Sequence, residues 1–294
     1  REGLTQGVDD AHLSRELVTI KTDLDLPIEL EEMELGRFDF ETMDQLFQEL
    51  EFFRLQSQLD AFRSEENIKI VEEVEKDFVT VESSKELKTL VKILKDAELI
   101  SFDVESTSTD PMRAEIVGFS FAVKPDAGWY LPVLFPEKEK PLFGGNDDLL
   151  TVLAELKPIL EDLSLGKCGQ NIKYDMLIMK RHGIEVKGVQ FDTMIAAHLI
   201  RPEAHSYKLD YLSQEHLRYT MQPITELIGS GKGQKRMDEV SLEDISFYAA
   251  EDADVCLQLV PIFMEKLEEV SLRKIYTDVE VPLLPTLVNM EYHG

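Results

Sequence analysis

The chain has 294 residues, of which 43% are hydrophobic, and it carries a formal net charge of −27 at pH 7. This length accommodates one large or two modest domains. Such an acidic balance argues against a protein that binds polyanions through a broad basic surface, although metal ions can mask acidic side chains at one local site. No apolar run approaches the roughly 20 residues of a membrane span. Two cysteines, Cys168 and Cys256, are too few for a disulfide framework, so we expect a cytoplasmic protein that does not bind membranes.

The acidic charge is concentrated in the first quarter of the chain, where residues 1–76 hold 8 Lys and Arg against 21 Asp and Glu. The chain begins at Arg1 with neither Met nor a signal-peptide pattern, and we expect it to be a piece of a longer protein. Residues 17–20 fit either a short strand or the end of a helix. From Asp39 onward, apolar residues recur at three- and four-residue spacing, which predicts a helix capped by Asp39. Residues 63–76 are mostly charged and predict a linker.

A compact domain is predicted after this linker. Three of its strands follow one another with short connections and predict an antiparallel meander. Alternating strands and helices come next, so the fold class is α/β, with a mixed sheet covered by helices. Residues 220–238 show no periodicity and are expected to be irregular. The expected strands cover residues 77–81, 99–103, 115–123, 128–133, 167–169 and 189–191, and the expected helices cover 85–96, 148–162, 171–182, 193–200, 209–217, 241–269 and 279–292.

Two acidic residues stand at alternate positions near the end of one buried strand. Asp103 and Glu105 follow the apolar run 99–102, and alternate residues of a strand share a face. Two such carboxylates repel each other unless a cation lies between them, and Mg²⁺ prefers oxygen ligands of this kind. The alternative is a strand end that simply turns polar at a loop.

Further acidic positions lie far along the chain. Asp175 falls one turn into a helix that follows a strand, where an acid can also serve the helix dipole. Tyr248 and Asp252 are four residues apart and share one face of a late helix, which is also a common spacing for an ordinary hydrogen-bonded pair. Asp254 lies off that face. Asp192 opens a helix, and we expect it to cap that helix and not to bind a metal.

Taken together, these residues follow a known order. An Asp-x-Glu strand, an Asn-x-x-Tyr-Asp helix and a late Tyr-x-x-x-Asp helix resemble the DEDDy exonuclease superfamily. The chain around them resembles the proofreading domain of bacterial family A DNA polymerases, which implies a ribonuclease H-like fold. The segments that carry this second resemblance are 102–106, 117–121, 169–175, 191–194 and 248–255.

The flanking segments are also similar to this polymerase family. Residues 15–21 and 47–52 resemble the end of the 5′-nuclease domain that precedes the proofreading domain, and residues 281–294 resemble the first helix of the polymerase domain. The resemblance implies four parts: the end of a 5′-nuclease domain (1–62), a linker (63–76), a 3′-5′ exonuclease domain (77–272) and a truncated start of the polymerase domain (273–294).

The resemblance implies hydrolysis of DNA from a 3′ end, assisted by two divalent ions, Mg²⁺ or Mn²⁺, with release of nucleoside 5′-monophosphates. Asp103 would bridge the two ions. Glu105 and Asp252 would complete the shell of one ion, and Asp175 would hold the other. Tyr248 would orient the attacking water.

The resemblance to the same family also implies which residues contact DNA. Gln170, Asn171 and Tyr174 match positions that line the pocket for the strand end, and Thr109 stands nearest to the position of an apolar wedge residue. A basic loop is expected either to contact phosphates or to be a solvated loop; its residues are Lys232, Lys235 and Arg236.

Two other functions are compatible with parts of this pattern. A ribonuclease D-like enzyme that trims RNA shares the four acids and the tyrosine, but it would continue into a small helical nucleic-acid-binding domain. An inert spacer of the polymerase would keep the fold without the carboxylates, whereas all four acids are present here. The expected partners are a single-stranded or frayed DNA 3′ end and the polymerase domain of the same full-length chain. We expect a monomer near the bacterial nucleoid.

Overall fold

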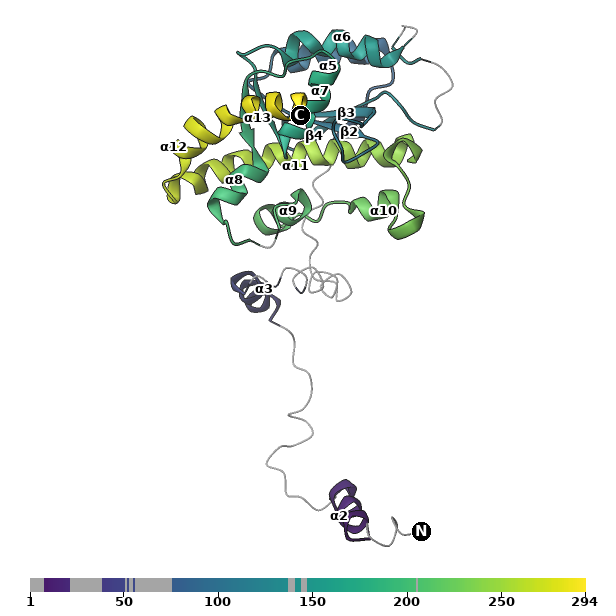
Figure 1. The fold of residues 1–294 in the computed structure, drawn as a ribbon, viewed down its shortest axis with the longest axis vertical. Helices are drawn as coiled ribbons and strands as arrows, with labels where there is room; N and C mark the ends of the chain where they lie inside the picture. Colours follow the sequence, from purple (N-terminus) through teal and green to yellow (C-terminus); the bar gives the residue numbers. More distant parts are fainter. Residues whose placement is uncertain are drawn as a thin grey trace. The chain divides into compact units, whose positions relative to one another are not determined.

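The computed structural model describes residues 8–21, 39–50, 52, 55, 76–136, 141–143, 147–204 and 206–294 (Figure 1). The chain divides into two compact units, residues 1–51 and 52–294. The predicted linker over 63–76 lies outside the described residues, apart from Lys76. None of the described helices is long and apolar enough to cross a membrane.

The first unit contains two described helices. α2 spans Val8–Val18, so residues 17 and 18 end a helix, and the helical interpretation of this segment is the one confirmed. α3 spans Phe40–Glu49. The backbone amide of Thr42 donates to Asp39 Oδ1 at 3.1 Å, which confirms the predicted cap.

The second unit is built on a six-stranded sheet with the order β1-β4-β3-β2-β5-β6. β2, β3 and β4 form the predicted antiparallel meander, and β1, β5 and β6 pair in parallel with β4, β2 and β5. The predicted mixed sheet is therefore confirmed. The strands are β1 (Asp77–Thr80), β2 (Leu99–Ser106), β3 (Ile116–Lys124), β4 (Ala127–Pro132), β5 (Gly166–Gly169) and β6 (Val189–Asp192).

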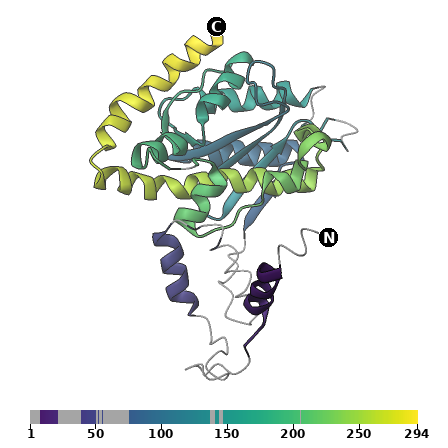
Figure 2. The same ribbon diagram turned by 60° about the horizontal axis from the view of Figure 1, so that its bottom comes forward.

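Helices cover both faces of the sheet, as Figures 1 and 2 show. One face packs against α5 (Ser84–Lys95), α6 (Asp148–Leu160) and α7 (Ile172–Arg181), and its core includes Phe102, Val104 and Phe119. The other face packs against the long helix α11 (Leu242–Glu269), with α8 (Thr193–Ile200) and α9 (Leu209–Leu217) beside it. Because both faces are covered, β3 is buried at all but its last two residues.

The helix starts follow local sequence. Ser83 accepts a hydrogen bond from the amide of Glu86 at the start of α5, and Asp147 and Ser241 cap α6 and α11 in the same way. Both cysteines are free and buried, as expected for small core residues.

Two predictions needed correction. Residues 220–238 are not wholly irregular, because they include the short helix α10 (Ile224–Ile228) and two 3₁₀ turns, Gly231–Gly233 and Met237–Glu239. A five-residue helix is too short to show a helical period. The last helix also begins earlier than predicted: α12 (Arg273–Ile275) and a π-helical turn (Tyr276–Glu280) lead into α13 (Val281–His293).

The C-terminal segment packs on the sheet unit. The hydroxyl of Tyr276 is buried and accepts a hydrogen bond from the backbone amide of Asp192 at 2.6 Å. Leu284 and Val288 of α13 are buried in the core that contains α7. The division of this segment from the exonuclease domain at residue 272 stays a prediction.

Candidate active site

The end of β2 presents two acids to the face of the sheet that α11 covers. Phe102 and Val104 point into the opposite core, and strand alternation therefore turns Asp103 and Glu105 toward α11. Asp103 lies opposite Ser120 and Glu105 lies opposite Gly118 on β3. The predicted shared face of the two acids is confirmed.

Asp175 reaches the same strand from α7. The chain passes from β5 to α7 through Asn171, which adopts a left-handed conformation with φ 55°. Asp175 Oδ1 accepts a hydrogen bond from the backbone amide of Val104 at 3.1 Å. The third carboxylate is thus fixed to the strand at the residue between Asp103 and Glu105.

α11 supplies the remaining pair. Tyr248 and Asp252 lie one turn apart and line the same cleft as Asp103 and Glu105. The helix crosses the sheet and contacts β2, β3 and β4, which fixes its distance from the acids of β2.

Glu105 and Asp175 are buried, Asp103 and Asp252 are half-buried, and the four carboxylates repel one another. Burial raises the pKa of Asp103 to about 6. The pKa of Glu105 is raised well above its usual value, first by burial and then by the charges of Asp103 and Asp252. Burial and the charge of Asp103 also raise the pKa values of Asp175 and Asp252. Without a cation, the four acids therefore oppose each other's ionisation.

The donor chemistry fits a hard divalent cation. The ligands on offer are carboxylate oxygens, and Glu105 Oε1 is buried without a hydrogen-bond partner among the described residues. As the side chains lie, the described residues do not gather three or more His, Cys, Asp or Glu side chains into a group that could hold an ion.

A cleft of about 610 Å³ opens over these residues. The loop after β2, including Thr109, forms one wall, and Asn171 and Tyr174 form another. The hydroxyl of Tyr174 contacts Ser106 Oγ at 2.5 Å and donates to the backbone carbonyl of Ser108, so it fastens this loop. Lys235 and Arg236 of the basic loop also line the cleft.

One predicted DNA-contacting residue lies away from the cleft, and the side chain of another is not described. Gln170 does not line it: its Nε2 donates to the carbonyl of Tyr207 at 2.7 Å, and its Oε1 accepts from the hydroxyl of Thr193. The side chain of Lys232 is outside the described part. Arg236 pairs with Asp238, at 2.5 Å between Nη2 and Oδ2.

Sequence reasoning missed an apolar wall of the cleft. Ile224 and Ile228 of α10, together with Met237, line the cleft beside the acids. The only sequence signal was the isolated Ile-x-x-x-Ile spacing, which α10 is too short to extend into a recognisable amphipathic pattern.

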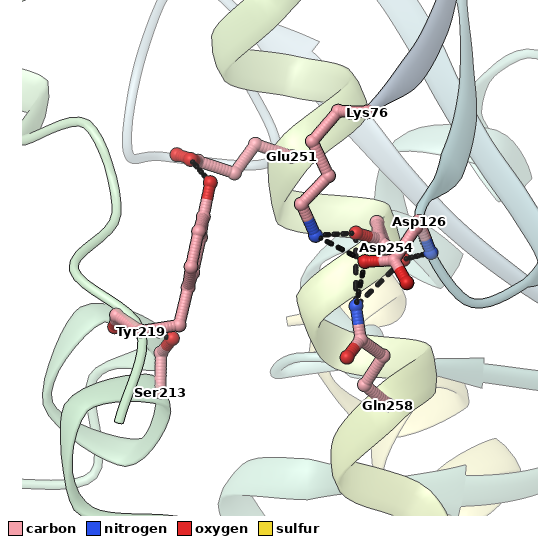
Figure 3. A network of polar contacts seen from close by, with 7 residues as sticks. All are labelled: Lys76, Asp126, Ser213, Tyr219, Glu251, Asp254 and Gln258. Carbon is pink, nitrogen blue, oxygen red and sulfur yellow. Dashed lines mark hydrogen bonds and ion pairs between the residues drawn. The ribbon is translucent and has the colours of Figure 1, made fainter. Parts of the chain in front are cut away.

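Two acids outside the cleft have structural roles. Asp192 caps α8 by accepting from the amide of Ile195 at 3.0 Å and also accepts from the amide of Ile172 at 2.8 Å, so the expected capping role is confirmed. Asp254 faces away from the cleft, where Lys76 Nζ contacts its Oδ2 at 2.7 Å (Figure 3).

Comparisons with known proteins match most of the chain. A 3′-5′ exonuclease family model of DNA polymerase A matches residues 78–268. DNA polymerase I of Pseudomonas aeruginosa is 35% identical over 300 residues, an alignment that covers 99% of this chain and 32% of the polymerase. The chain thus spans about a third of the length of the curated relatives it matches.

Solved structures share the fold at low identity. Escherichia coli RNase D is 16% identical, with a TM-score of 0.54 over 72% of this chain and 50% of RNase D. Brucella melitensis NrnC with bound Mg²⁺ is 17% identical, with a TM-score of 0.52 over 75% of this chain and 95% of NrnC. These similarities concern the fold alone, and they confirm the ribonuclease H-like arrangement predicted from the sequence.

Proposed function

Because this chain belongs to the 3′-5′ exonuclease domain family of DNA polymerase I, we propose that its cleft performs metal-dependent hydrolysis of DNA from a 3′ end. The observation that carries the proposal is the convergence of Asp103, Glu105, Tyr248 and Asp252 on one cleft, with Asp175 bonded to the same strand. These side chains come from three elements that lie far apart in sequence.

The four carboxylates would hold two divalent ions, with Mg²⁺ or Mn²⁺ matching their oxygen ligands. When bound, the ions would lower the pKa of the attacking water and neutralise charge on the leaving oxygen. Mg²⁺ is bound in the structure of NrnC named above, which shares this fold.

The chain's own residues would bind and orient the substrate. Burial and the neighbouring carboxylates raise the pKa of Tyr248, so its hydroxyl stays protonated and can hold the attacking water in place by a hydrogen bond. Asn171 and Tyr174 would contact the terminal nucleotide, and Lys235 would contact a phosphate. The apolar wall of α10 and Met237 offers a surface against which a base can pack.

The remaining parts of the chain are assigned on the same basis. We propose that residues 1–62 end a 5′-nuclease domain, that 63–76 are a linker, and that 273–294 begin a polymerase domain, which would be the intramolecular partner of residues 77–272. The alignment with the Pseudomonas aeruginosa polymerase, which extends over 99% of this chain, supports this assignment.

The test is digestion of a 5′-labelled single-stranded DNA in Mg²⁺, in Mn²⁺ and in chelator. We expect a metal-dependent ladder that shortens from the 3′ end and is lost in Asp103→Ala. Asp96→Ala, which removes an exposed acid at the end of α5, serves as the matched control and should keep the ladder. No ladder from folded protein would support the inert spacer, and preferential digestion of an RNA of the same sequence would support the ribonuclease D-like function.

A further inference from the structure

Four buried polar side-chain atoms have no hydrogen-bond partner among the described residues. Two of them are the hydroxyl of Tyr130 and Oε1 of Glu105, and the others are the hydroxyls of Ser101 and Ser120. The Tyr130 side chain is 0% exposed and Glu105 is 6% exposed. A buried polar atom without a partner costs free energy, so two such atoms on one face of a sheet call for an explanation.

The sheet register places these groups close together. Glu105 lies directly opposite Gly118 on the neighbouring strand. A Cβ built on Gly118 would lie only 2.3 Å from the hydroxyl oxygen of Tyr130, which reaches over this glycine from β4. The phenol oxygen therefore occupies the place where a side chain of residue 118 would begin.

This position is within reach of the Glu105 carboxylate. Opposite residues of an antiparallel pair have Cβ atoms about 4.5–5.5 Å apart on one face. The hydroxyl of Tyr130 lies 2.3 Å from the built Cβ of Gly118, so it stands within about 8 Å of the Cβ of Glu105, a gap into which the glutamate side chain can extend. We expect a rotation of the Glu105 side chain to bring Oε1 within hydrogen-bond distance of this hydroxyl.

The chemistry of the pair agrees with its geometry. Burial and the charge of Glu105 raise the pKa of Tyr130, so the phenol remains a donor at neutral pH. Of the two tyrosines that line the cleft, Tyr248 is hydrogen-bonded to Asp252, and the hydroxyl of Tyr174 is bonded to Ser106 and Ser108. Tyr130 is therefore the phenol available to Glu105.

We propose that Tyr130 is a positioning residue: its hydroxyl donates to Glu105 Oε1 and holds this carboxylate in the orientation that serves the cleft, over the space that Gly118 leaves open. Tyr130 does not line the cleft and does not touch the substrate. The consequence for catalysis rests on the proposed role of Glu105, whereas the hydrogen bond itself does not.

The hydrogen bond is tested by thermal unfolding in chelator. Tyr130→Phe, which removes only the hydroxyl, should lower the melting temperature by a few degrees. The same substitution in a Glu105→Ala background should cause no loss, because the acceptor is gone. Tyr276→Phe is the matched control: it removes a buried hydroxyl bonded to the Asp192 backbone, and its loss should be equal in both backgrounds. An unchanged or raised melting temperature for Tyr130→Phe, or an equal loss in both backgrounds, would overturn the proposal.

Catalysis gives the second readout. In single-turnover digestion of labelled single-stranded DNA with Mg²⁺, Tyr130→Phe should slow cleavage by about tenfold at saturating enzyme, and adding it to Glu105→Ala should slow cleavage no further. A wild-type rate for Tyr130→Phe would refute the positioning role. A wild-type rate for Glu105→Ala would instead refute the proposed function of Glu105, and the unfolding experiment would still decide whether the hydrogen bond exists.

Discussion

The stability of the sheet unit should depend strongly on Lys76, the residue that precedes β1. Its Nζ lies 2.7 Å from Asp126 Oδ1 and 2.7 Å from Asp254 Oδ2 (Figure 3). The Lys76 side chain is 12% exposed and that of Asp254 is 0% exposed. Asp254 also accepts from the backbone amide of Asp126 at 2.8 Å and from Gln258 Nε2 at 3.0 Å. One lysine thus joins the first strand, the turn between β3 and β4, and α11.

Lys76→Met removes the cation but keeps most of the aliphatic stem. Removing one partner of a buried ion pair typically costs 3–5 kcal/mol, because the other charge stays buried without compensation. Two hydrogen bonds to Asp254 remain, so we expect the lower end of this range, about 3 kcal/mol in the free energy of unfolding.

Burial alone would lower the pKa of Lys76, but the hydrogen bonds and charges of Asp126 and Asp254 outweigh it and raise that pKa. The stabilisation is therefore fully present below the ordinary lysine pKa and is lost as pH rises through the higher pKa of the folded state.

Urea unfolding at pH 7 measures this loss. Lys85→Met, on the exposed face of α5, is the matched control and should change stability by no more than about 0.5 kcal/mol. In the double variant Lys76→Met/Asp254→Asn, we expect recovery of about 1–2 kcal/mol relative to Lys76→Met, because a neutral amide needs no cation. A loss below about 1 kcal/mol for Lys76→Met, or no recovery in the double variant, would contradict a structural role for the ion pair.

Two further predictions concern titration. The pKa of Asp103 is raised to about 6, so between pH 4 and 6 the folded state keeps a proton that the unfolded chain has released. In chelator, the free energy of unfolding should therefore fall as pH rises from 4 to 7, by up to about 3 kcal/mol. Mg²⁺ should abolish this fall. At pH 7 in chelator, Asp103→Asn should be more stable than the parent protein, and Mg²⁺ should raise its stability less than it raises that of the parent. An equal rise in stability would place the metal elsewhere. Burial, and then the charges of Lys266 and Arg201, lower the pKa of His216 to about 4. The free energy of unfolding should therefore fall as pH falls from 7 to 4, by at most about 3 kcal/mol. The loss is limited because Glu215 Oε2 lies 3.8 Å from His216 Nε2 and can pair with the protonated ring. His216→Gln should flatten this slope in urea unfolding, and an unchanged slope would assign it to other groups.

Much of the fold could be predicted because its elements carry their own boundaries. Ser241 predicts the start of α11 and the apolar periodicity predicts its length, so the 28-residue helix was found to within a residue. The meander was predictable because its strands are rich in branched and aromatic residues and follow one another with short connections. α10 and the early start of α12 were not predictable, since a few residues in a helical turn leave no period in the sequence.

The acids of the site could be predicted from spacing and resemblance, but their surroundings could not. Gln170 shows the limit: it matches a family position that lines the pocket for the strand end, whereas the structure bonds its amide to Tyr207 and Thr193. Which neighbour a polar side chain meets depends on the register and on loops that are far apart in sequence, and no local pattern encodes these contacts.

The alternation of β2 explains how the candidate catalytic acids can occupy a central strand. Phe102 and Val104 fix the strand to the core on one face, while Asp103 and Glu105 face α11 on the other. Rigid placement on a central strand holds the carboxylates close enough to raise one another's pKa values, which destabilises the metal-free protein and favours cation binding. Ion pairs and caps such as Lys76–Asp254 and Asp192 offset that cost at a distance from the cleft. A single strand would therefore couple the stability of the fold to the cation affinity of the proposed site. Substitutions that weaken the repulsion between the acids should stabilise the protein and remove the proposed activity.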